Sequence, residues 1–556
     1  MSATPIPSRA QILVIGGGPS GSYAASALAR EGLDVVLLEA AQFPRYHIGE
    51  SMIPSVRYYL RFIDAEEKVK AFGFEKKPGA AVKFNQYKQE GYSDFVALGP
   101  NAHSWNVSRA DFDEILLRHA AESGAAVFER TRVNELHFSE DEQRRPISAS
   151  YTRGEETGTI SFDYLIDASG RAGILSTKYL KNRKFNESLK NIAIWGYWQS
   201  TGGYMKGTGL DREGAPYFEA LTDESGWAWF IPLSNGKTSV GIVMNQKLYN
   251  ERVRAMSAVD SSAQHTLLDR YLAALPLAPN VSKLIGKEAE LIRDSVGFDE
   301  KGDRTTLPTI KMASDYSYSS QTYAGPGWRL AGDAGAFIDP FFSSGVHLAF
   351  TGGLSAAATV SASIRGDCDE ETACRWHTER VSISYTRFLL VVLSAYKQIR
   401  SQSLDVLSDV DEDNFDRVFN FIRPVIQGAA DMGERLFAKE VDEALDFCGK
   451  LFAPVSKDTQ LAVRRSMGLD YELSNAGAIK AQDSEANVTP GKDGEGIVDT
   501  KYEEETKEIL EKINQGSAVK REEVKDTANI NNFEEEPIDG RVVRLERGHL
   551  GLVAVC

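Results

Sequence analysis

Along its N-terminal portion the chain alternates short apolar runs with longer amphipathic ones. QILVIGGG (residues 11–18) and DVVLLEA (34–40) are apolar runs of the kind that form buried strands. Between them, SYAASALAREG (22–32) has the apolar spacing of a helix. SRADFDEILLRHAAESG (108–124) predicts a second helix, with Ser108 as its N-cap. This βα alternation predicts an α/β fold.

The pattern changes beyond about residue 190. IAIWGYWQS, WAWFIPL and TSVGIVM are shorter, aromatic and alternating, which predicts the sheet of a second domain between about 190 and 300. Residues 325–364 return to a glycine-rich strand–turn–helix pattern. Residues 370–470 are mostly helical in pattern, and VSISYTRFLLVVLSAYKQIR is their most apolar part.

The charge and cysteine content of the chain exclude several classes of protein. With 63 Lys and Arg against 79 Asp and Glu, the net charge of the 556 residues is −16, so we expect no nucleic-acid partner. Four cysteines without metal-ligand spacing and eight scattered histidines predict no metal site. The cysteine usage and the lack of a signal-peptide pattern predict a reducing, cytoplasmic location. The longest apolar run, FLLVVL (388–393), is too short to span a membrane.

A glycine-rich turn carries the clearest chemistry. Gly16-x-Gly18-x-x-Gly21 follows the first predicted strand and opens the first predicted helix, and Glu39 ends the next strand. Glycines allow a tight turn and a close approach to a pyrophosphate, the helix N-terminus stabilises its charge, and the acid binds ribose hydroxyls. The motif therefore predicts a dinucleotide site, but it leaves NAD(P) and FAD open.

Two later segments favour FAD. YLIDASGRAG (164–173) is typical of the strand and turn that close a nucleotide domain, and GWRLAGDAG places Gly332-Asp333 after a strand. These segments resemble the flavoprotein monooxygenases, in which the aspartate of such a pair meets the ribityl or ribose part of FAD. The same resemblance implies that the Arg109 side chain points towards the cofactor. The helix predicted to start near Gly345 has an N-terminus suited to an anion or to the flavin edge.

Four stretches narrow the resemblance to the flavin-dependent halogenases, and most closely to the fungal free-standing enzymes that chlorinate phenolic polyketides and related aromatics. They are FPRYHIGESMIPS, GFEKKPGA, WAWFIP and DPFFSSG, and the likeness covers residues 8–470. The resemblance implies that a separate flavin reductase supplies FADH2, which reacts with O2 to give a C4a-hydroperoxide. Chloride attacks the distal oxygen, and the hypochlorous species formed reaches a lysine. The lysine holds or activates it, as hydrogen-bonded HOCl or as a chloramine, for a small, activated aromatic substrate.

The resemblance also assigns roles to single residues. Lys77 matches the catalytic lysine, and the backbone amides of Ser344 and Gly345 match the chloride site. A lysine suits this role because its ammonium donates protons and its pKa falls readily on burial. With the glycine motif and Glu39 included, the expected flavin-binding residues are Gly16, Gly17, Gly18, Ser20, Gly21, Glu39, Glu50, Arg109, Asp333 and Val346.

One position departs from the tryptophan halogenases. Those enzymes carry a glutamate two residues before the position that Ser344 matches, where it assists deprotonation of the substrate, whereas this chain has Phe342. A phenol needs less help because its own hydroxyl activates the ring, so we expect a phenolic substrate rather than free tryptophan. Trp227 and Trp229 stand two residues apart and share one face of a strand. That spacing alone favours core packing, but with the flavin motifs beside it we expect a partition between flavin and substrate.

Two other functions stay open at this point. An aromatic hydroxylase of the same fold would reduce its own FAD with NAD(P)H and pass oxygen directly to a substrate. It would leave Lys77 without a role, and the two indoles would obstruct its substrate. A non-catalytic flavin-binding protein, with the acidic tail as its partner-binding element, is the third possibility. The absence of a second GxGxxG motif favours the halogenase, because no dedicated NAD(P)H domain is then expected.

Together these observations predict a Rossmann-like FAD-binding domain of the flavoprotein monooxygenase type, with an inserted β-sheet substrate domain and a helical C-terminal region. The expected segments are 8–80, 106–180 and 306–366 for FAD binding, 81–105 and 181–305 for the substrate-side sheet, 367–475 for a helical lid, and 476–556 for an acidic, largely disordered tail.

Overall fold

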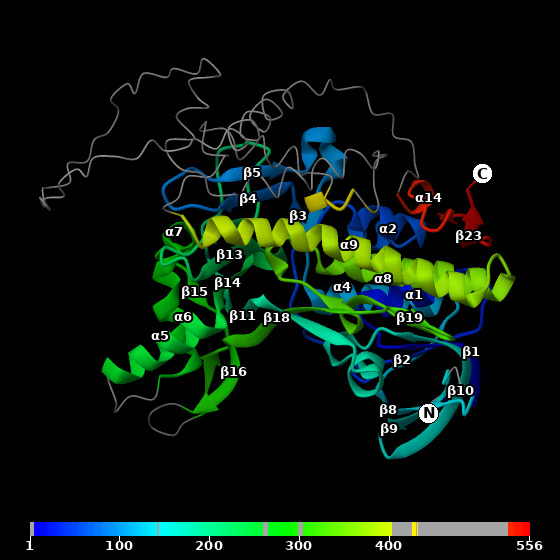
Figure 1. Ribbon diagram of the computed structural model, residues 1–556. Helices are drawn as coiled ribbons and strands as arrows, with labels where there is room; N and C mark the ends of the chain where they lie inside the picture. The colour runs from blue at the N-terminus through cyan, green and yellow to red at the C-terminus, as the bar shows by residue number, and fades with distance from the viewer. Residues whose placement is uncertain are drawn as a thin grey trace, which may run out of the picture.

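Two β-sheets lie side by side, and one long helix, α9 (Glu370–Ile399), runs across both of them (Figure 1). The structure, a computed structural model, describes residues 5–141, 144–259, 265–298, 304–402, 425–429, 431 and 532–555. The expected lid beyond residue 402 and the expected tail before residue 532 therefore lie outside the described residues, apart from 425–429 and 431.

The first sheet is the Rossmann-like one that the βα alternation predicts. Its parallel core has the strand order β20-β10-β1-β2-β7. These strands are β1 (Arg9–Ile15), β2 (Val35–Leu38), β7 (Ala126–Phe128), β10 (Glu156–Asp167) and β20 (Trp328–Leu330). β8 (Thr131–Phe138), β9 (Pro146–Arg153) and β19 (Ala324–Gly325) add antiparallel strands. Successive strands are added on one side of β1 as β2 and β7, and on its other side as β10 and β20. Open α/β sheets bind their ligands at such a reversal of the strand order.

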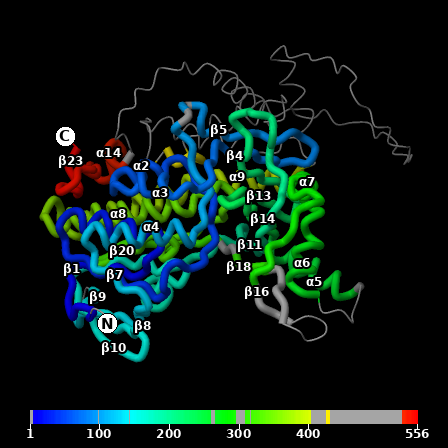
Figure 2. The backbone as a smooth tube through the Cα atoms, turned by 180° about the vertical axis from the view of Figure 1, so that it is seen from behind, coloured from blue at the N-terminus to red at the C-terminus, as the bar shows by residue number. Residues whose placement is uncertain are grey.

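Helices α1 (Pro19–Arg30), α4 (Arg109–Glu122) and α8 (Gly345–Arg365) pack on this sheet (Figure 2). Helix α8 approaches the start of α1 very closely. A Cβ atom on Gly353 would lie 2.8 Å from the carbonyl oxygen of Ser20, and one on Gly352 would lie 3.0 Å from the amide nitrogen of Gly332. Because only glycine permits this approach, the two glycines hold α8 against the glycine turn and the Gly332 turn together.

The second sheet has the order β21-β18-β11-β14-β13-β12-β4-β5, with β15 beside β11. Its strands are β4 (Gly79–Lys83), β5 (Gly91–Asp94), β11 (Arg183–Gln199), β12 (Tyr217–Ala220), β13 (Gly226–Pro232), β14 (Lys237–Asn245), β15 (Glu290–Leu291), β18 (Lys311–Ser320) and β21 (Ala336–Phe337). The aromatic segments predicted as sheet are β11, β13 and β14, so that prediction is confirmed. Three short pairs are β3 (Glu75–Lys77) with β6 (Ser104–Asn106), β16 (Arg293–Phe298) with β17 (Arg304–Pro308), and β22 (Arg541–Arg544) with β23 (Gly551–Ala554).

The sequence analysis missed three helices between β14 and β15. They are α5 (Gln246–Val259), α6 (Leu267–Ala274) and α7 (Pro279–Ile285), and their apolar side chains share one core cluster with the outer face of the second sheet. A local signal was available, since Thr266 and Asp269 form a capping box at the start of α6. Shorter helices are α2 (Val56–Phe62), α3 (Glu66–Phe72) and α14 (Asn532–Glu535).

Among the described residues, no helix combines the length and apolar character needed to cross a membrane. No group of His, Cys, Asp and Glu side chains in the same residues could hold a metal ion.

A buried network of charges ties two distant segments to α8 and α9. Asp431 accepts a hydrogen bond from Arg380 at 2.5 Å and lies 2.9 Å from Nε2 of His347 and 3.3 Å from Arg387. Glu536, just after α14, accepts from Arg380 at 2.7 Å and from Arg387 at 2.6 Å. Burial alone would raise the pKa of Asp431, but Arg380, His347 and Arg387 outweigh it and hold the pKa well below its usual value.

Replacing Asp431 tests this network. Asp431→Asn removes one of the two carboxylates that the buried arginines share, and we expect a loss of roughly 3–5 kcal/mol of stability, measured as a lower thermal unfolding midpoint at neutral pH. Because the folded pKa is depressed, the contribution is fully present above the unfolded value of about 3.9 and is lost as the pH falls towards the folded one. The difference between the two proteins should therefore shrink in acid.

The exposed ion pair between Arg375 and Asp539 supplies the control, because exposed pairs contribute little. Asp539→Asn should leave the midpoint almost unchanged. Equal midpoints for Asp431→Asn and the unaltered protein would show that the network does not hold these segments together.

Candidate active site

A cavity of about 570 Å³ lies where the two sheets meet. Its polar wall comes from the first sheet and includes the turn after β1, Glu39, Arg109 and Asp333. Its apolar wall comes from the second sheet and its neighbours. The apolar side chains are Ala193, Trp195, Phe218, Trp227, Trp229 and Ile231. A concave site with one polar and one apolar wall is suited to a large amphipathic ligand.

The glycine turn packs as tightly as a pyrophosphate cradle requires. Gly16 has a φ of 102°, and a Cβ atom there would lie 2.3 Å from the carbonyl oxygen of Ala168. A Cβ atom on Gly21 would lie 1.9 Å from the carbonyl oxygen of Gly16. Helix α1 begins directly after Gly18, with Pro19 in its first turn. The first amides of α1 are therefore free to bind an anion in the cavity.

Glu39 stands at the end of β2, as the motif predicts. Its Oε2 accepts the backbone N–H of Gly17 at 2.6 Å, and its Oε1 accepts the N–H of Ala41 at 2.7 Å. These bonds hold the carboxylate in one orientation beside the cavity. Each oxygen keeps a further lone pair, so the carboxylate can still accept a ribose hydroxyl.

Arg109 and Asp333 both line the cavity, although they stand far apart in the sequence. Arg109 begins α4 and is held by Asp113, with 2.8 Å between Nε and Oδ1, while its Nη1 donates to the carbonyl oxygen of Ile48 at 2.8 Å. Burial raises the pKa of Asp333, and Arg109 opposes that shift. The glycine cradle, the free helix amides and these polar groups together fit a flavin dinucleotide.

The turn before α8 has the features of an anion site. Ser344 is the N-cap of α8 and is fully buried, and its Oγ has no hydrogen-bond partner among the described residues. The preceding Ser343 has a φ of 57°, which turns the chain sharply into the helix. The first amides of α8, at Gly345 and Val346, line the cavity. A buried hydroxyl and free helix amides are the donors that a halide ion prefers.

Trp227 and Trp229 stand side by side in the apolar wall, with their ring centroids 5.8 Å apart. Trp195 of β11, which is separated from β13 by β14, lies 6.2 Å from Trp229 and extends the wall. The Trp227 indole donates to Oη of Tyr396 on α9 at 2.9 Å, and Tyr396 donates to Oδ2 of Asp339 at 2.7 Å. The wall is thereby connected to the loop that leads to Ser344.

Lys77 does not line the cavity, but it is buried with only 1% of its surface exposed. It ends β3, and its Nζ lies 5.0 Å from the centre of the Phe95 ring. Burial lowers the pKa of Lys77 to about 7, so a large fraction of the amine is uncharged at neutral pH. Its neighbour Lys76 is exposed.

A row of buried polar side chains connects Lys77 with the cavity. Lys77 pairs with Ser104 across β3 and β6, and Asn106 of β6 forms a bridge with Ser51. Paired residues on neighbouring strands place their side chains on one face. The side-chain polar atoms of Ser104, Asn106 and Ser51 have no hydrogen-bond partner within the described part of the chain, and Ser51 lines the cavity. These unpaired polar atoms therefore form a buried row that leads from the cavity lining towards Lys77.

The cavity gathers most of the residues predicted from the sequence, while four lie just outside its lining. Those in the lining are Gly16, Gly18, Ser20, Glu39, Glu50, Arg109, Asp333, Gly345 and Val346. Gly17 and Gly21 shape the turn behind it, Ser344 caps α8, and Lys77 lies at the end of the polar row.

Sequence reasoning missed Tyr46 and Tyr197. The Tyr197 hydroxyl donates to Oε1 of Glu50 at 2.6 Å, and the two tyrosine oxygens lie 3.0 Å apart. Both residues stand inside stretches already selected for other reasons, FPRYHIGES and IAIWGYWQS. Their pairing depends on the contact between two segments that no local pattern reveals.

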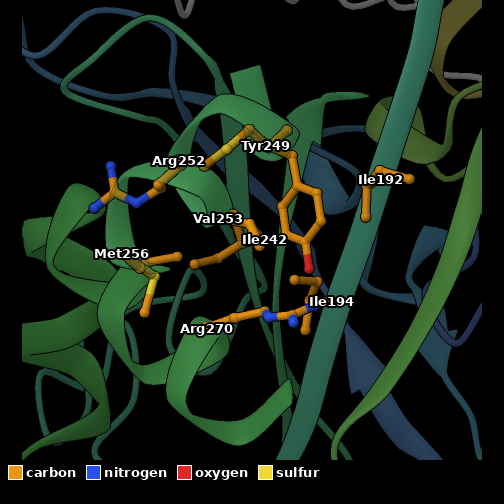
Figure 3. A pocket seen from close by; sticks show the side chains of 10 residues that line it. Ile192, Ile194, Ile242, Tyr249, Arg252, Val253, Met256 and Arg270 are labelled. Carbon is orange, nitrogen blue, oxygen red and sulfur yellow. The ribbon is translucent and has the colours of Figure 1, made fainter. Parts of the chain in front are cut away.

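A second cavity, beneath α5 and α6 on the outer face of the second sheet, holds only about 10 Å³. Tyr249, Val253 and Met256 of α5 face Ile192 and Ile194 of β11 around it (Figure 3). Its volume is about that of one water molecule, so it is a packing gap and not a substrate site.

The Rossmann-like sheet, the glycine cradle and the cavity between two sheets define a flavin-dependent oxidoreductase. The family model described as "Tryptophan halogenase" matches residues 11–103 and 93–403. The chain is 51% identical over 554 residues to the flavin-dependent halogenase armH1 of Armillaria mellea, with 99% of both chains covered. It is 44% identical over 565 residues to the sulochrin halogenase gedL of Aspergillus terreus, covering 98% of this chain and 94% of that one.

Solved structures of flavin-dependent halogenases are also similar to this chain. The flavin-dependent halogenase CmlS superposes with a TM-score of 0.60 at 25% identity, over 83% of this chain and 70% of that one. The myxobacterial chondrochloren halogenase CndH has a TM-score of 0.60 at 26% identity, over 81% of this chain and 99% of that one. The chain therefore belongs to the flavin-dependent halogenases, oxidoreductases that use reduced FAD and chloride and generally need a separate flavin reductase.

The glycine turn gives the first test of the cofactor site. Gly21→Ala places a methyl group against the carbonyl oxygen of Gly16, and backbone atoms there cannot move aside, so we expect FAD affinity to fall by roughly tenfold or more. Affinity is measured by quenching of flavin fluorescence. Gly203→Ala is the control, because its nearest neighbour is the flexible Lys206 side chain at 3.5 Å. Unchanged FAD binding by Gly21→Ala would place the dinucleotide elsewhere.

Proposed function

We propose that this halogenase chlorinates an activated, phenolic aromatic compound, with Lys77 holding the hypochlorous acid that reacts with the ring. Bound reduced FAD supplies the activation of O2 that oxidises chloride. The observation that carries the proposal is the burial of Lys77 at the end of a polar row that begins in the cavity. A buried amine with a pKa of about 7 can both donate a proton to hypochlorous acid and exist as the free base.

Within this proposal each wall of the cavity has a task. The residues proposed to bind FAD are Gly16, Gly17, Gly18, Ser20, Gly21, Glu39, Glu50, Arg109, Asp333 and Val346. Ser344 and Gly345 bind chloride through their backbone amides, and the buried Ser344 hydroxyl adds a third donor. Trp227 and Trp229 keep the organic substrate away from the flavin, while a small oxidant passes along the polar row.

The loop before α8 favours a phenol over tryptophan. Phe342 is buried and stacks edge to face on Phe341, with ring centroids 5.0 Å apart, so this position offers no carboxylate to accept a proton from the ring. A phenol needs less assistance because its hydroxyl already activates the ring. A fungal relative 44% identical to this chain is named for sulochrin, which supports a natural-product substrate other than tryptophan here as well.

The proposal also covers the supply of reducing equivalents. The chain has one GxGxxG motif, so we infer that a separate flavin reductase delivers FADH2, in the cytoplasm. An aromatic hydroxylase would instead need its substrate beside the flavin, where the indole wall stands, and would give Lys77 no role. Membership of the halogenase family also favours the halogenase over the hydroxylase.

Replacing Lys77 tests the central assignment. Lys77→Met keeps the length of the side chain but removes the amine, and we expect chlorination of a phenolic substrate to fall at least about 10²-fold while reduced FAD is still consumed. The assay contains FAD, a flavin reductase, NADH, O2 and chloride, and mass spectrometry follows the chlorine isotope pattern. Lys76→Ala, at the exposed neighbour, should chlorinate normally. Normal chlorination by Lys77→Met would refute the role of this lysine.

The indole wall has its own test. Trp227→Ala combined with Trp229→Ala opens the apolar wall, so we expect hydroxylated product or oxidant released into solution, detected by product mass and by a chlorine-accepting reagent. Trp198→Phe, whose indole bonds to Tyr271 on the outer face of the same sheet, is the control. FAD binding confirms that each variant is folded. A product profile identical to that of the unaltered protein would show that the two tryptophans are ordinary core residues.

A further inference from the structure

Glu50 is a buried carboxyl group with a hydrogen-bond partner that contact with the flavin alone would not require. Only 4% of its surface is exposed, and it lines the cavity. Its Oε1 accepts a hydrogen bond from Tyr197 at 2.6 Å, while its Oε2 has no hydrogen-bond partner among the residues described. One oxygen is thus engaged with the protein, and the other keeps its lone pairs free of protein partners in a residue that lines the cavity.

From Glu50 a chain of hydrogen bonds leads to the surface. The oxygens of Tyr197 and Tyr46 lie 3.0 Å apart, and the Trp195 indole donates to Tyr46 at 2.8 Å. Tyr197 has one hydroxyl proton and gives it to Glu50, so Tyr46 must be the donor to Tyr197. All the donors therefore point towards the cavity. Tyr46 is 47% exposed, so the outermost residue of this chain of hydrogen bonds lies at the surface.

The reaction needs such a route because it consumes a proton. Chlorination of a ring C–H takes up the aromatic, one chloride ion, O2, FADH2 and one proton, and it yields the chlorinated ring, FAD and two waters. The C–H and O–O bonds break and the C–Cl bond forms. O2 accepts four electrons, two from the flavin and two from the conversion of the C–H bond and chloride into the C–Cl bond. Since chloride enters as an anion, one proton must reach the cavity from solvent in every turnover.

We propose that Tyr46, Tyr197 and Glu50 form a proton relay from solvent to the cavity. A proton arriving at the Tyr46 oxygen releases the Tyr46 hydroxyl proton to Tyr197, and the Tyr197 proton passes to the Glu50 carboxylate. The carboxyl group then gives a proton to an acceptor in the cavity, and rotation of the hydroxyls restores the chain. The relay rests on the proposed function, because halogenation is the reaction that would use the proton. The hydrogen bonds that form the relay do not depend on that proposal.

The electrostatics suit a carboxyl group that both binds and releases protons near neutrality. Burial raises the pKa of Glu50 to about 7, while the groups that face it, Tyr197 of β11, Ser239 of β14 and Arg109 of α4, oppose that shift. A group with a pKa near the working pH is the most effective proton carrier.

The two tyrosines remain neutral donors under the same conditions. Burial raises the pKa of Tyr46 to about 12 against the hydrogen bonds of Tyr197 and Trp195, and burial also raises the pKa of Tyr197 far above its usual value. The other charges near Tyr46 are Lys311, 4.0 Å from its ring centre, and Asp294. The phenols therefore pass protons on without being ionised themselves.

A reaction without chloride or substrate tests the relay apart from halogenation. Reoxidation of anionic reduced FAD by O2 to FAD and hydrogen peroxide also takes up one proton, and flavin absorbance follows it. Tyr197→Phe and Tyr46→Phe keep the carboxyl group but remove a hydroxyl, so we expect reoxidation above pH 7 to slow by roughly tenfold or more. Rising concentrations of imidazole buffer should restore the rate in both variants and leave the unaltered enzyme unaffected.

Tyr204→Phe is the matched control, because it removes a tyrosine–glutamate hydrogen bond, to Glu90 at 3.1 Å, outside the cavity lining. It should reoxidise FAD at the normal rate. Reoxidation rates equal to those of the unaltered enzyme in Tyr197→Phe and Tyr46→Phe, without any response to buffer, would overturn the relay.

Infrared spectroscopy of the FAD-free protein gives a readout that needs no turnover. A carboxylic acid C=O band should titrate near pH 7 and be absent from Glu50→Gln. In Tyr197→Phe the band should persist to higher pH, because the Tyr197 hydrogen bond lowers the pKa of Glu50. Titration at the usual value of about 4.3 would also refute the relay. A failure to chlorinate any phenol, with both readouts as expected, would refute the proposed function and leave the relay standing.

Discussion

The close packing of α8 on α1 is the constraint on which the site depends. Gly352 and Gly353 bring α8 so near to Ser20 and Gly332 that a methyl group at either glycine would meet backbone atoms. One helix thereby fixes the distance between the glycine turn, the Gly332 turn and its own N-terminus. The residues proposed to contact the cofactor and the halide are consequently placed by a single rigid body, and not by loops that move separately.

That rigid body is held from behind by segments far away in the sequence. His347, two residues beyond the start of α8, contacts Asp431, and the arginines of α9 that share Asp431 also bind Glu536. Residues near the C-terminus are thus bonded, through two buried arginines, to the end of α8 that faces the cavity. An acidic segment near a C-terminus can therefore be part of the folded structure when buried cations pair with its carboxylates.

Local patterns predicted the parts of the fold that local chemistry dictates. Apolar runs identified β1 and β2, and spacing identified α1, α4 and the aromatic strands, because periodicity is a property of each segment alone. The glycine motif with Glu39 predicted a dinucleotide site at the turn that now lines the cavity, and the resemblance proposed Lys77, whose role stays a prediction. Beyond reach were contacts between segments, such as Tyr46 with Tyr197, which stand 151 residues apart. The helices α5 to α7 were missed because the flanking aromatic strands dominated the pattern.

The hydrogen bond between Trp227 and Tyr396 has a consequence for how such enzymes diversify. Tyr396 also binds Asp339, which begins the loop before α8, and Asn191 of β11 bonds to both Tyr396 and Asp339. The indole wall, which we propose excludes the substrate, and the loop before α8, which we propose leads to the halide site, therefore share one set of hydrogen bonds. A substitution on α9 that displaces Tyr396 would disturb both, so the wall and the loop can change independently only through side chains outside this set.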